Sequence, residues 1–229
     1  MADCVLGICD GSGFVVDEVS NTAAPCQCRA QIISRRKARS LSAVIPRKYK
    51  DVSFDRNPVA QMPEPVVRQI RGYIRAMDAN LDAGRGLWLV GEVGTGKTTL
   101  AMLVAKAALE QGRSVAIYSM PRLLNEIRRT YDEGSDSSYI QLLDRLAEVD
   151  LLHIDDVGAE KSSAWVLEQV YAIVNARYEA QRSMTITTNL GDEELSEQIG
   201  IRTVSRLKEM CELLPLHGND QRPYLEHSA

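Results

Sequence analysis

The sequence predicts an α/β domain built around a parallel sheet that helices cover on both faces. Two observations lead to this prediction. Short apolar runs alternate with helical stretches along residues 63–229, which is the pattern of strands buried on both faces. A glycine-rich turn also joins one apolar run to a helix, and such turns at strand ends are where open parallel sheets bind ligands.

The expected elements of this region alternate in a regular order. A helix over residues 65–82 comes first, because apolar residues from Val66 to Met77 recur at helical spacing. Apolar runs predict five strands, at residues 86–90, 114–119, 150–154, 184–188 and 212–216. Helices are expected at residues 98–110, 121–131, 137–148, 162–180, 192–198 and 201–210. Together they give a three-layer sandwich, preceded by a cysteine-rich segment (1–28) and a basic helical linker (29–62).

Composition favours an ordinary globular protein of the cytoplasm. Hydrophobic residues make up 45% and charged residues 25% of the 229 residues, as in typical soluble domains. No apolar run approaches the length of a membrane span. The first residues lack the basic and apolar regions of a secretory signal, so we expect a cytoplasmic protein without disulfides or a membrane partner.

The glycine-rich turn fits the phosphate-loop pattern G-x-x-x-x-G-K-S/T. It consists of Gly91, Glu92, Val93, Gly94, Thr95, Gly96, Lys97 and Thr98, and Thr99 follows. Glycines let the backbone turn its N–H groups toward a phosphate, and the following helix offers its positive end. Lys97 would reach the β- and γ-phosphates, and Thr98 would bind Mg²⁺. ATP or GTP binding is therefore the leading hypothesis, against a chance match in a glycine turn.

Polar residues follow two later apolar strands. Asp155 and Asp156 end one strand, and we assign Asp155 to Mg²⁺ and Asp156 to the attacking water. Asn189 ends the next strand and would lie beside the γ-phosphate if that strand lies between the other two. Both features also occur in ordinary turns. Asp156 is one methylene shorter than Glu, so we expect slow hydrolysis until a partner adjusts the geometry.

Arginines near the C-terminus are candidates for charge stabilisation. Arg202, Arg206 and Arg222 follow the last polar strand end, and the planar fork of arginine suits phosphate. One of them could act from a neighbouring subunit. The sequence alone does not decide which arginine acts, or whether it acts within or between subunits.

Two features of the N-terminal region suggest partners. Cys4, Cys9, Cys26 and Cys28 lie in a segment too short for its own core, so Zn²⁺ would fold it, with free thiols or a redox pair as alternatives. Eight of the 27 basic residues lie between residues 29 and 50, where no acidic residue occurs. This basic arm favours nucleic acid or a protein partner, against a solvated helix face.

The ordered set of motifs resembles the AAA+ helicase-loader family, which comprises bacterial DnaC and DnaI loaders and IstB transposition helpers. The resemblance covers almost the whole chain and is carried by residues 9–14, 25–29, 45–49, 91–98, 154–158, 175–178, 187–190, 205–207 and 218–222. The first cysteine pair departs from the family's usual Cys-x-x-Cys, since Leu6 occupies the usual first position. The chain also ends soon after the last strand, so we expect no full helical lid, as in other loaders of this type.

The resemblance implies roles for particular residues. Asn189 is similar to the sensor 1 residue, Arg206 to an arginine finger that reaches a neighbour's ATP, and Arg222 to the sensor 2 arginine. It also favours zinc at the four cysteines. It implies self-assembly, a hexameric replicative helicase bound through the N-terminal region, and single-stranded DNA bound through the AAA+ part.

Three functions are compared on this basis. The first is an ATPase that loads the replicative helicase onto single-stranded DNA, with slow, partner-stimulated turnover. The second is a transposition helper that assembles on duplex DNA. The third is a metabolic phosphate-loop kinase, for which the sequence shows no acceptor motif. A chromosomal loader cannot be distinguished from a phage or mobile-element one.

Overall fold

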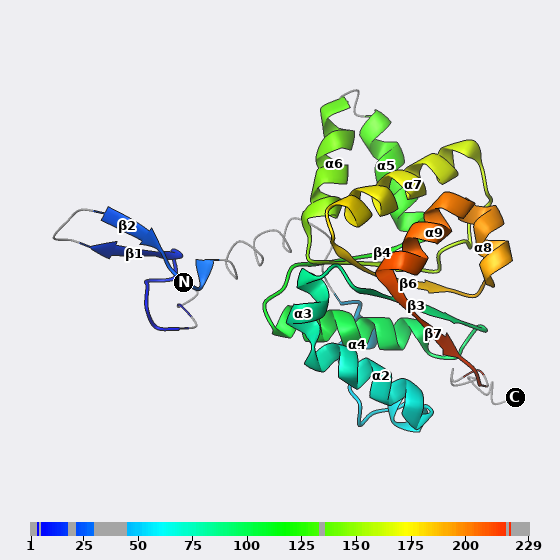
Figure 1. Ribbon diagram of the computed structural model, residues 1–229, viewed down its shortest axis with the longest axis horizontal. Helices are drawn as coiled ribbons and strands as arrows, with labels where there is room; N and C mark the ends of the chain where they lie inside the picture. The colour runs from blue at the N-terminus through cyan, green and yellow to red at the C-terminus, as the bar shows by residue number, and fades with distance from the viewer. Residues whose placement is uncertain are drawn as a thin grey trace, which may run out of the picture.

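The computed structural model describes residue 4 and residues 6–17, 22–29, 45–132, 136–218 and 220. Residues 45–220 contain the large α/β body, and residues 4–29 contain a small cysteine-rich hairpin (Figure 1). Arg222 and the basic residues Arg35, Arg36, Lys37 and Arg39 lie outside the described residues. The roles expected of them therefore stay predictions.

Five parallel strands form the central sheet of the body (Figure 1). Their bounds are β3 Gly86–Gly91, β4 Val115–Ser119, β5 Leu151–Asp155, β6 Ser183–Thr188 and β7 Cys211–Leu216. They lie in the order β4-β5-β6-β3-β7, and every neighbouring pair is parallel. The predicted sheet is confirmed, and β6 does lie between the strand of the glycine loop and the strand of the paired acids.

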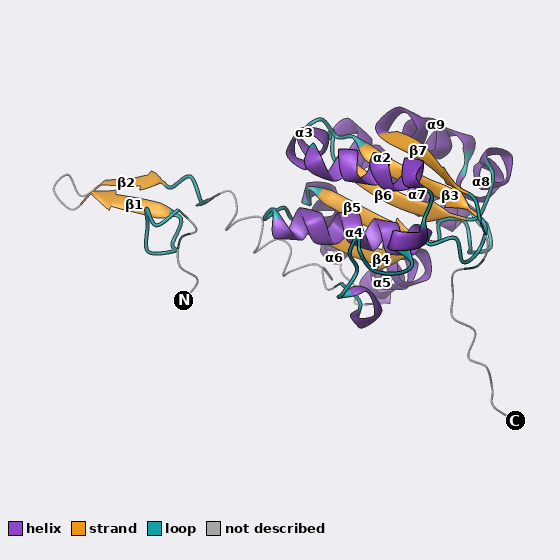
Figure 2. Ribbon diagram, turned by 90° about the horizontal axis from the view of Figure 1, so that it is seen from below, coloured by secondary structure: helices purple, strands orange, loops and turns teal. Residues whose placement is uncertain are grey.

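Helices cover both faces of the sheet (Figure 2). One face carries α2 Glu64–Arg75, α3 Met77–Asp82 and α4 Lys97–Glu110. The other carries α5 Met120–Asp132, α6 Asp136–Glu148, α7 Ala164–Glu179, α8 Asp192–Ile199 and α9 Ile201–Met210. Successive strand residues point to opposite faces, so Leu87 and Leu89 join the core beneath α4 while Trp88 joins the core beneath α5 to α9.

One predicted helix is divided in the structure. Residues 65–82 form α2 and α3 instead of a single helix, because Ala76 leaves the helical conformation with φ of −99° and ψ of 24°. After this break the Met77 and Leu81 side chains are both 1% exposed and join the core with α4. Hydrophobic periodicity does not detect such a break, because both halves keep the apolar spacing of a helix.

The described part of the linker lies against α4. Two short 3₁₀ helices, η1 Arg47–Tyr49 and η2 Val59–Gln61, occur in it. Val59 is 1% exposed and belongs to the core beneath α4. Lys106 of α4 donates to the carbonyl oxygens of Lys50 and Val52, at 3.2 and 3.0 Å. Residues 45–62 are thereby fixed beside the glycine loop.

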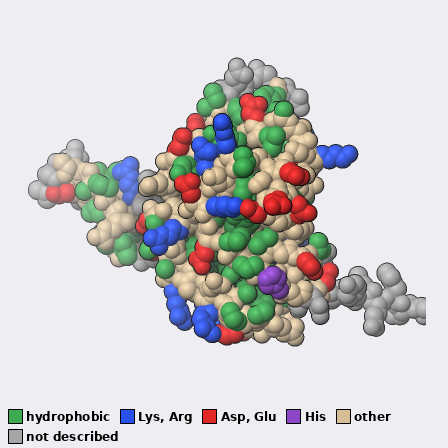
Figure 3. Space-filling model, turned by 45° about the vertical axis from the view of Figure 1, so that its right-hand side comes forward, with side chains coloured by type: hydrophobic (Ala, Val, Ile, Leu, Met, Phe, Trp, Pro, Cys, Tyr) green, Lys and Arg blue, Asp and Glu red, His purple; other side chains and the backbone are tan. Residues whose placement is uncertain are grey.

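The surface of the body is mixed in charge. On the face shown in Figure 3, acidic and basic side chains are interspersed with hydrophobic ones. Within the described ranges, none of the helices combines the length and apolar character that a membrane crossing requires.

Candidate functional site

The glycine-rich loop joins β3 to α4. Gly94 and Gly96 have φ of +85° and +91°, in the left-handed region that glycine adopts without steric cost. A Cβ atom on Gly96 would also collide with the terminal methyl group of Met62. The Thr95 hydroxyl braces the turn by donating to the Glu92 carbonyl oxygen at 2.8 Å. This geometry, at the positive end of α4, favours a bound anion.

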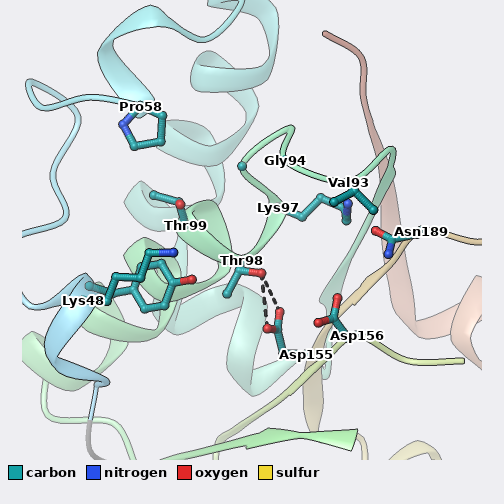
Figure 4. Close-up of a pocket in the computed structure, with 12 residues that line it drawn as sticks. Lys48, Pro58, Val93, Gly94, Lys97, Thr98, Thr99, Asp155, Asp156 and Asn189 are labelled. Atoms are coloured by element: carbon teal, nitrogen blue, oxygen red, sulfur yellow. Dashed lines mark hydrogen bonds between the residues drawn. The ribbon is translucent and has the colours of Figure 1, made fainter. Parts of the chain in front are cut away.

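Lys97 is the first residue of α4 and is only 5% exposed. Its ammonium group donates to the carbonyl oxygens of Gly91 and Glu92, at 2.8 and 2.7 Å. These bonds hold a positive charge inside the loop. Figure 4 shows Lys97 reaching into the same space as Asn189 and Asp156.

Thr98 and Asp155 are brought together from α4 and β5. The Thr98 hydroxyl donates to both carboxylate oxygens, at 2.9 and 3.2 Å (Figure 4). Burial raises the pKa of Asp155, but the adjacent His153 ring and the hydroxyls of Thr187 and Thr98 lower it by more, so the pKa lies below its usual range. A hydroxyl beside an ionised carboxylate is an oxygen pair that suits Mg²⁺.

His153 contributes to this environment from inside the sheet. Its ring is fully buried. Nδ1 lies 3.0 Å from the Thr185 carbonyl oxygen, and Nε2 lies 3.7 Å from the Asp155 carboxylate.

Asp156 follows in an unusual backbone conformation, with φ of +56°. Its N–H donates to the Thr187 hydroxyl at 2.9 Å, and the next N–H, of Val157, donates to the Thr187 carbonyl oxygen at 2.8 Å. Asp156 and Asn189 both line the pocket beside the glycine loop. The ends of β3, β5 and β6 therefore supply the three groups of polar residues that the sequence predicted to converge.

The pocket has a volume of about 400 Å³. The residues along one side of it were not predicted from the sequence. Lys48, Tyr49 and Pro58 line it together with the loop and the acids. Figure 4 shows Lys48 and Pro58 on the side away from Asn189. The signal that could have located this side of the pocket is the segment 45–49, which belongs to the family resemblance but carried no assigned role.

Two of the candidate arginines, Arg202 and Arg206, lie on α9. Arg206 is half-buried on α9, where its guanidinium lies over the rings of Tyr171 and Tyr178 of α7, at 4.9 and 5.5 Å from their centroids. Arg202 is exposed one turn earlier. Neither residue lines the pocket of its own chain.

The four N-terminal cysteines converge. The Sγ atoms of Cys4, Cys9, Cys26 and Cys28 all lie within 4.8 Å of one another, and Cys9 and Cys28 are 3.4 Å apart. A backbone hydrogen bond at Cys9 is the largest of several effects that lower the pKa of the Cys4 thiol, to about 6. The antiparallel strands β1 Phe14–Asp17 and β2 Thr22–Pro25 connect the two pairs. Four thiols at this separation suit tetrahedral Zn²⁺, whose Zn–S bonds place sulfurs roughly 3.8 Å apart.

The strand order, the glycine loop and the paired acids define an AAA+ ATP-binding domain. The chain belongs to the IstB-like ATP binding protein family, whose model matches residues 33–227. The resemblance to DnaC-type helicase loaders is confirmed by individual relatives. The Escherichia coli K12 replicative helicase loader DnaC is 30% identical over 138 residues, which are 60% of this chain and 55% of that protein. The DnaC loader of Buchnera aphidicola from Acyrthosiphon pisum is 25% identical over 183 residues, which are 77% and 73% of the two chains.

Solved structures agree. A crystal structure of the DnaC helicase loader superposes with a TM-score of 0.64 at 28% identity, covering 75% of this chain and 99% of that one. The replication initiator DnaA, solved with AMPPCP and single-stranded DNA, shares the fold with a TM-score of 0.63 at 18% identity, covering 78% of this chain and 53% of that one. In the sequence comparison, this chain spans about half the length of the Escherichia coli DnaC loader.

Proposed function

We propose that this chain is an ATPase that loads a hexameric replicative helicase onto single-stranded DNA at the initiation of replication. In this proposal the protein acts in the cytoplasm. The observation that carries the proposal is a pocket in which the glycine loop, Asp155, Asp156 and Asn189 meet, in a chain that matches a DnaC loader structure over 99% of that chain's length at 28% identity. In this proposal residues 1–28 are a zinc module, residues 29–62 a partner-binding linker and residues 63–229 the ATPase.

The pocket residues divide the work of nucleotide binding and hydrolysis. Lys97 and the loop from Gly91 to Thr99 hold the phosphates, and Thr98 and Asp155 hold Mg²⁺. When bound, this ion neutralises charge that develops on the phosphates. Asp156 orients the attacking water and accepts its proton, and Asn189 hydrogen-bonds the water or the γ-phosphate. The positive φ of Asp156 sets the direction of its short side chain, so a partner that shifts this turn would change the rate.

Turnover depends on a neighbour in this proposal. Arg206 lies outside the pocket of its own chain and on an outer helix, α9. This placement supports a role in another subunit's site. Arg222 takes the role of the sensor 2 arginine in the nucleotide site, as the family resemblance implies.

A groove between α5 and α6 supports DNA binding. Its volume is about 840 Å³. Arg122, Arg129 and Arg145 line it with Asn125 and Gln141, and Glu126 is the one acidic residue among the described residues of its lining. Guanidinium and amide groups bind phosphate and sugar oxygens without reading sequence. Such a groove can follow a single strand through its backbone, with strong dependence on salt.

The proposal is tested by helicase transfer. The full-length chain is mixed with the bacterial replicative hexamer and a circular single strand, and helicase retained on the circle is measured with ATP, a non-hydrolysable analogue or no nucleotide. We expect retention to require this chain and ATP binding. Equal retention without the chain would contradict the loading function.

The family match also favours a second function, an IstB-like transposition helper on duplex DNA. The same preparation distinguishes the two. ATP-dependent filaments on duplex DNA without helicase contact would indicate the helper, whereas preference for single strands and recovery with the helicase would indicate the loader.

A further inference from the structure

Thr187 contacts both acids of the nucleotide site. It is a fully buried residue of β6 and pairs in register with Leu89 of β3. Its hydroxyl donates to Asp155 Oδ1 at 2.7 Å and accepts the backbone N–H of Asp156 at 2.9 Å. A single hydroxyl therefore links the residue assigned to the metal with the residue assigned to the water.

We propose that Thr187 is a positioning residue of the ATPase site, whose hydroxyl fixes both the Asp155 carboxylate and the turn that directs Asp156 into the pocket. This inference rests on the proposed ATPase function. It adds a role for a residue that would itself touch neither the nucleotide nor the metal.

The chemistry of a hydroxyl suits this double task. A hydroxyl has one proton to donate and lone pairs to accept, and both capacities are used here. Thr98 donates to the same Oδ1 atom at 2.9 Å and lies 3.2 Å from Oδ2. Because Thr187 and Thr98 both hold Oδ1, rotation of the Asp155 carboxylate is limited.

The Asp156 turn needs such support. A φ of +56° is uncommon for any residue other than glycine and persists where neighbouring contacts hold it. The side chain of Thr187 accepts from the Asp156 N–H, and its main-chain oxygen accepts from the Val157 N–H. Removing the Thr187 hydroxyl would break the hydrogen bond from the Asp156 N–H and keep the one from the Val157 N–H. The turn would then become more mobile without unfolding.

Thr185 provides a matched control on the same strand. It lies two residues earlier, on the same side of β6, and is equally buried. Its hydroxyl has no hydrogen-bond partner within the part of the chain that the structure describes. Thr185→Val therefore makes the same chemical change at the same depth without touching the acids.

The experiment compares Thr187→Val, Thr187→Ser and Thr185→Val in the full-length chain. A fluorescent ATP analogue gives nucleotide affinity with and without Mg²⁺, and phosphate release with helicase and single-stranded DNA gives turnover. For Thr187→Val we expect unchanged affinity without Mg²⁺, and a loss of about ten- to hundredfold in apparent Mg²⁺ affinity and in kcat, as when other outer-shell partners of a metal are removed. Thr187→Ser and Thr185→Val should stay near wild type.

The outcomes separate this inference from the ATPase proposal. A wild-type chain with no turnover rejects the ATPase proposal, while the Mg²⁺ dependence of nucleotide binding still decides the role of Thr187. Wild-type Mg²⁺ dependence in Thr187→Val, an equal loss in Thr185→Val, or no recovery in Thr187→Ser would each overturn the positioning role. If circular dichroism shows Thr187→Val unfolded, Thr187→Ala takes its place with the same expectations.

Discussion

The guanidinium of Arg206 lies 4.9 Å from the centre of the Tyr171 ring, so a cation is held against an aromatic face at the surface of α7 and α9. Tyr178 supports it from a second side, and the Tyr178 hydroxyl donates to Glu209 at 2.6 Å. Contacts of this kind restrict a long side chain. An arginine that must meet a neighbouring subunit's nucleotide benefits from being held in advance, since less ordering is needed on assembly.

Arg206→Ala should leave ATP binding intact but remove partner-stimulated hydrolysis. The expected loss approaches roughly a thousandfold, the lower end of what such arginines contribute in GTP hydrolysis. Phosphate release in the presence of helicase and single-stranded DNA measures it. Arg202→Ala is the control, since it removes the same charge from an exposed position one turn away on the same helix.

Mixing variants tests whether Arg206 acts between subunits. Arg206→Ala keeps its own nucleotide pocket, and a Lys97→Ala chain keeps its Arg206. If each is inactive alone, a mixture should regain hydrolysis, because the second chain completes the site of the first. No recovery at any ratio would exclude action in trans.

Lys97→Ala should abolish ATP binding, because the buried ammonium group inside the loop is lost. At about 100 times Kd, ATP adds roughly 2.7 kcal/mol to stability, which raises the Tm of a chain of this size by about 5–10 °C. Differential scanning calorimetry with and without ATP should show this rise in wild type and none in the variant. Lys208→Ala, which removes an exposed lysine of α9, should keep it. A full rise in Lys97→Ala would reject the site.

The positions of site residues could be predicted from the sequence where a local motif follows a strand of a parallel sheet. Thr98 and Asp155 are 57 residues apart, yet parallel strands place their carboxyl ends at one edge, so their contact follows from the strand assignment. The convergence of Asn189 with these residues follows in the same way once β6 lies between β3 and β5.

Other features required tertiary information. Lys48 and Pro58 reach the pocket because residues 45–62 lie across α4, and no periodicity indicates where a loop will lie. The double contact of Thr187 depends on which hydroxyl of a threonine-rich strand faces β5, which one sequence alone does not reveal. The break at Ala76 likewise gives no signal in the apolar spacing, which continues through both helices.

DNA binding through the α5–α6 groove should respond to arginine removal in proportion to charge. Arg129→Ala should weaken binding to any single strand and lower the slope of log affinity against log salt by about 0.7, the value for one phosphate contact on a single strand. Fluorescence anisotropy between low and moderate salt measures this slope. Arg68→Ala, on the exposed side of α2, should leave it unchanged. An unchanged slope in Arg129→Ala would place DNA elsewhere.

The cysteine cluster should contain about one zinc per chain, because four thiols match the four positions of a structural site. Cys26→Ser should lose the metal and helicase binding while ATP binding persists, since the pocket lies in the α/β body. Cys211→Ala removes the fifth cysteine, which lies outside the cluster, and should keep the metal. Elemental analysis provides the measurement. A wild-type preparation free of zinc, purified without chelators, would contradict the assignment.

Arg177 should be the costliest arginine to replace. It is fully buried in α7, and burial lowers its pKa to about 9, which leaves it charged at neutral pH. Its N–H groups donate to the carbonyl oxygens of Leu146, Ala147, Val149, Asp150 and Ser183. One side chain thus ties the end of α6 to the two residues before β5 and to the first residue of β6.

Arg177→Met keeps the bulk of the side chain but leaves these buried acceptors without donors, so we expect the free energy of unfolding to fall by about 3–5 kcal/mol. Arg182→Met is the control, because its side chain is 39% exposed and its ion pair with Asp150 spans 3.2 Å. A partly exposed pair of this kind contributes below about 1 kcal/mol. Urea unfolding followed by circular dichroism measures both. A loss below about 1 kcal/mol in Arg177→Met, no larger than in Arg182→Met, would show that the carbonyl oxygens that accept from Arg177 find other donors, such as water, and that this arginine does not hold β5 and β6 in place.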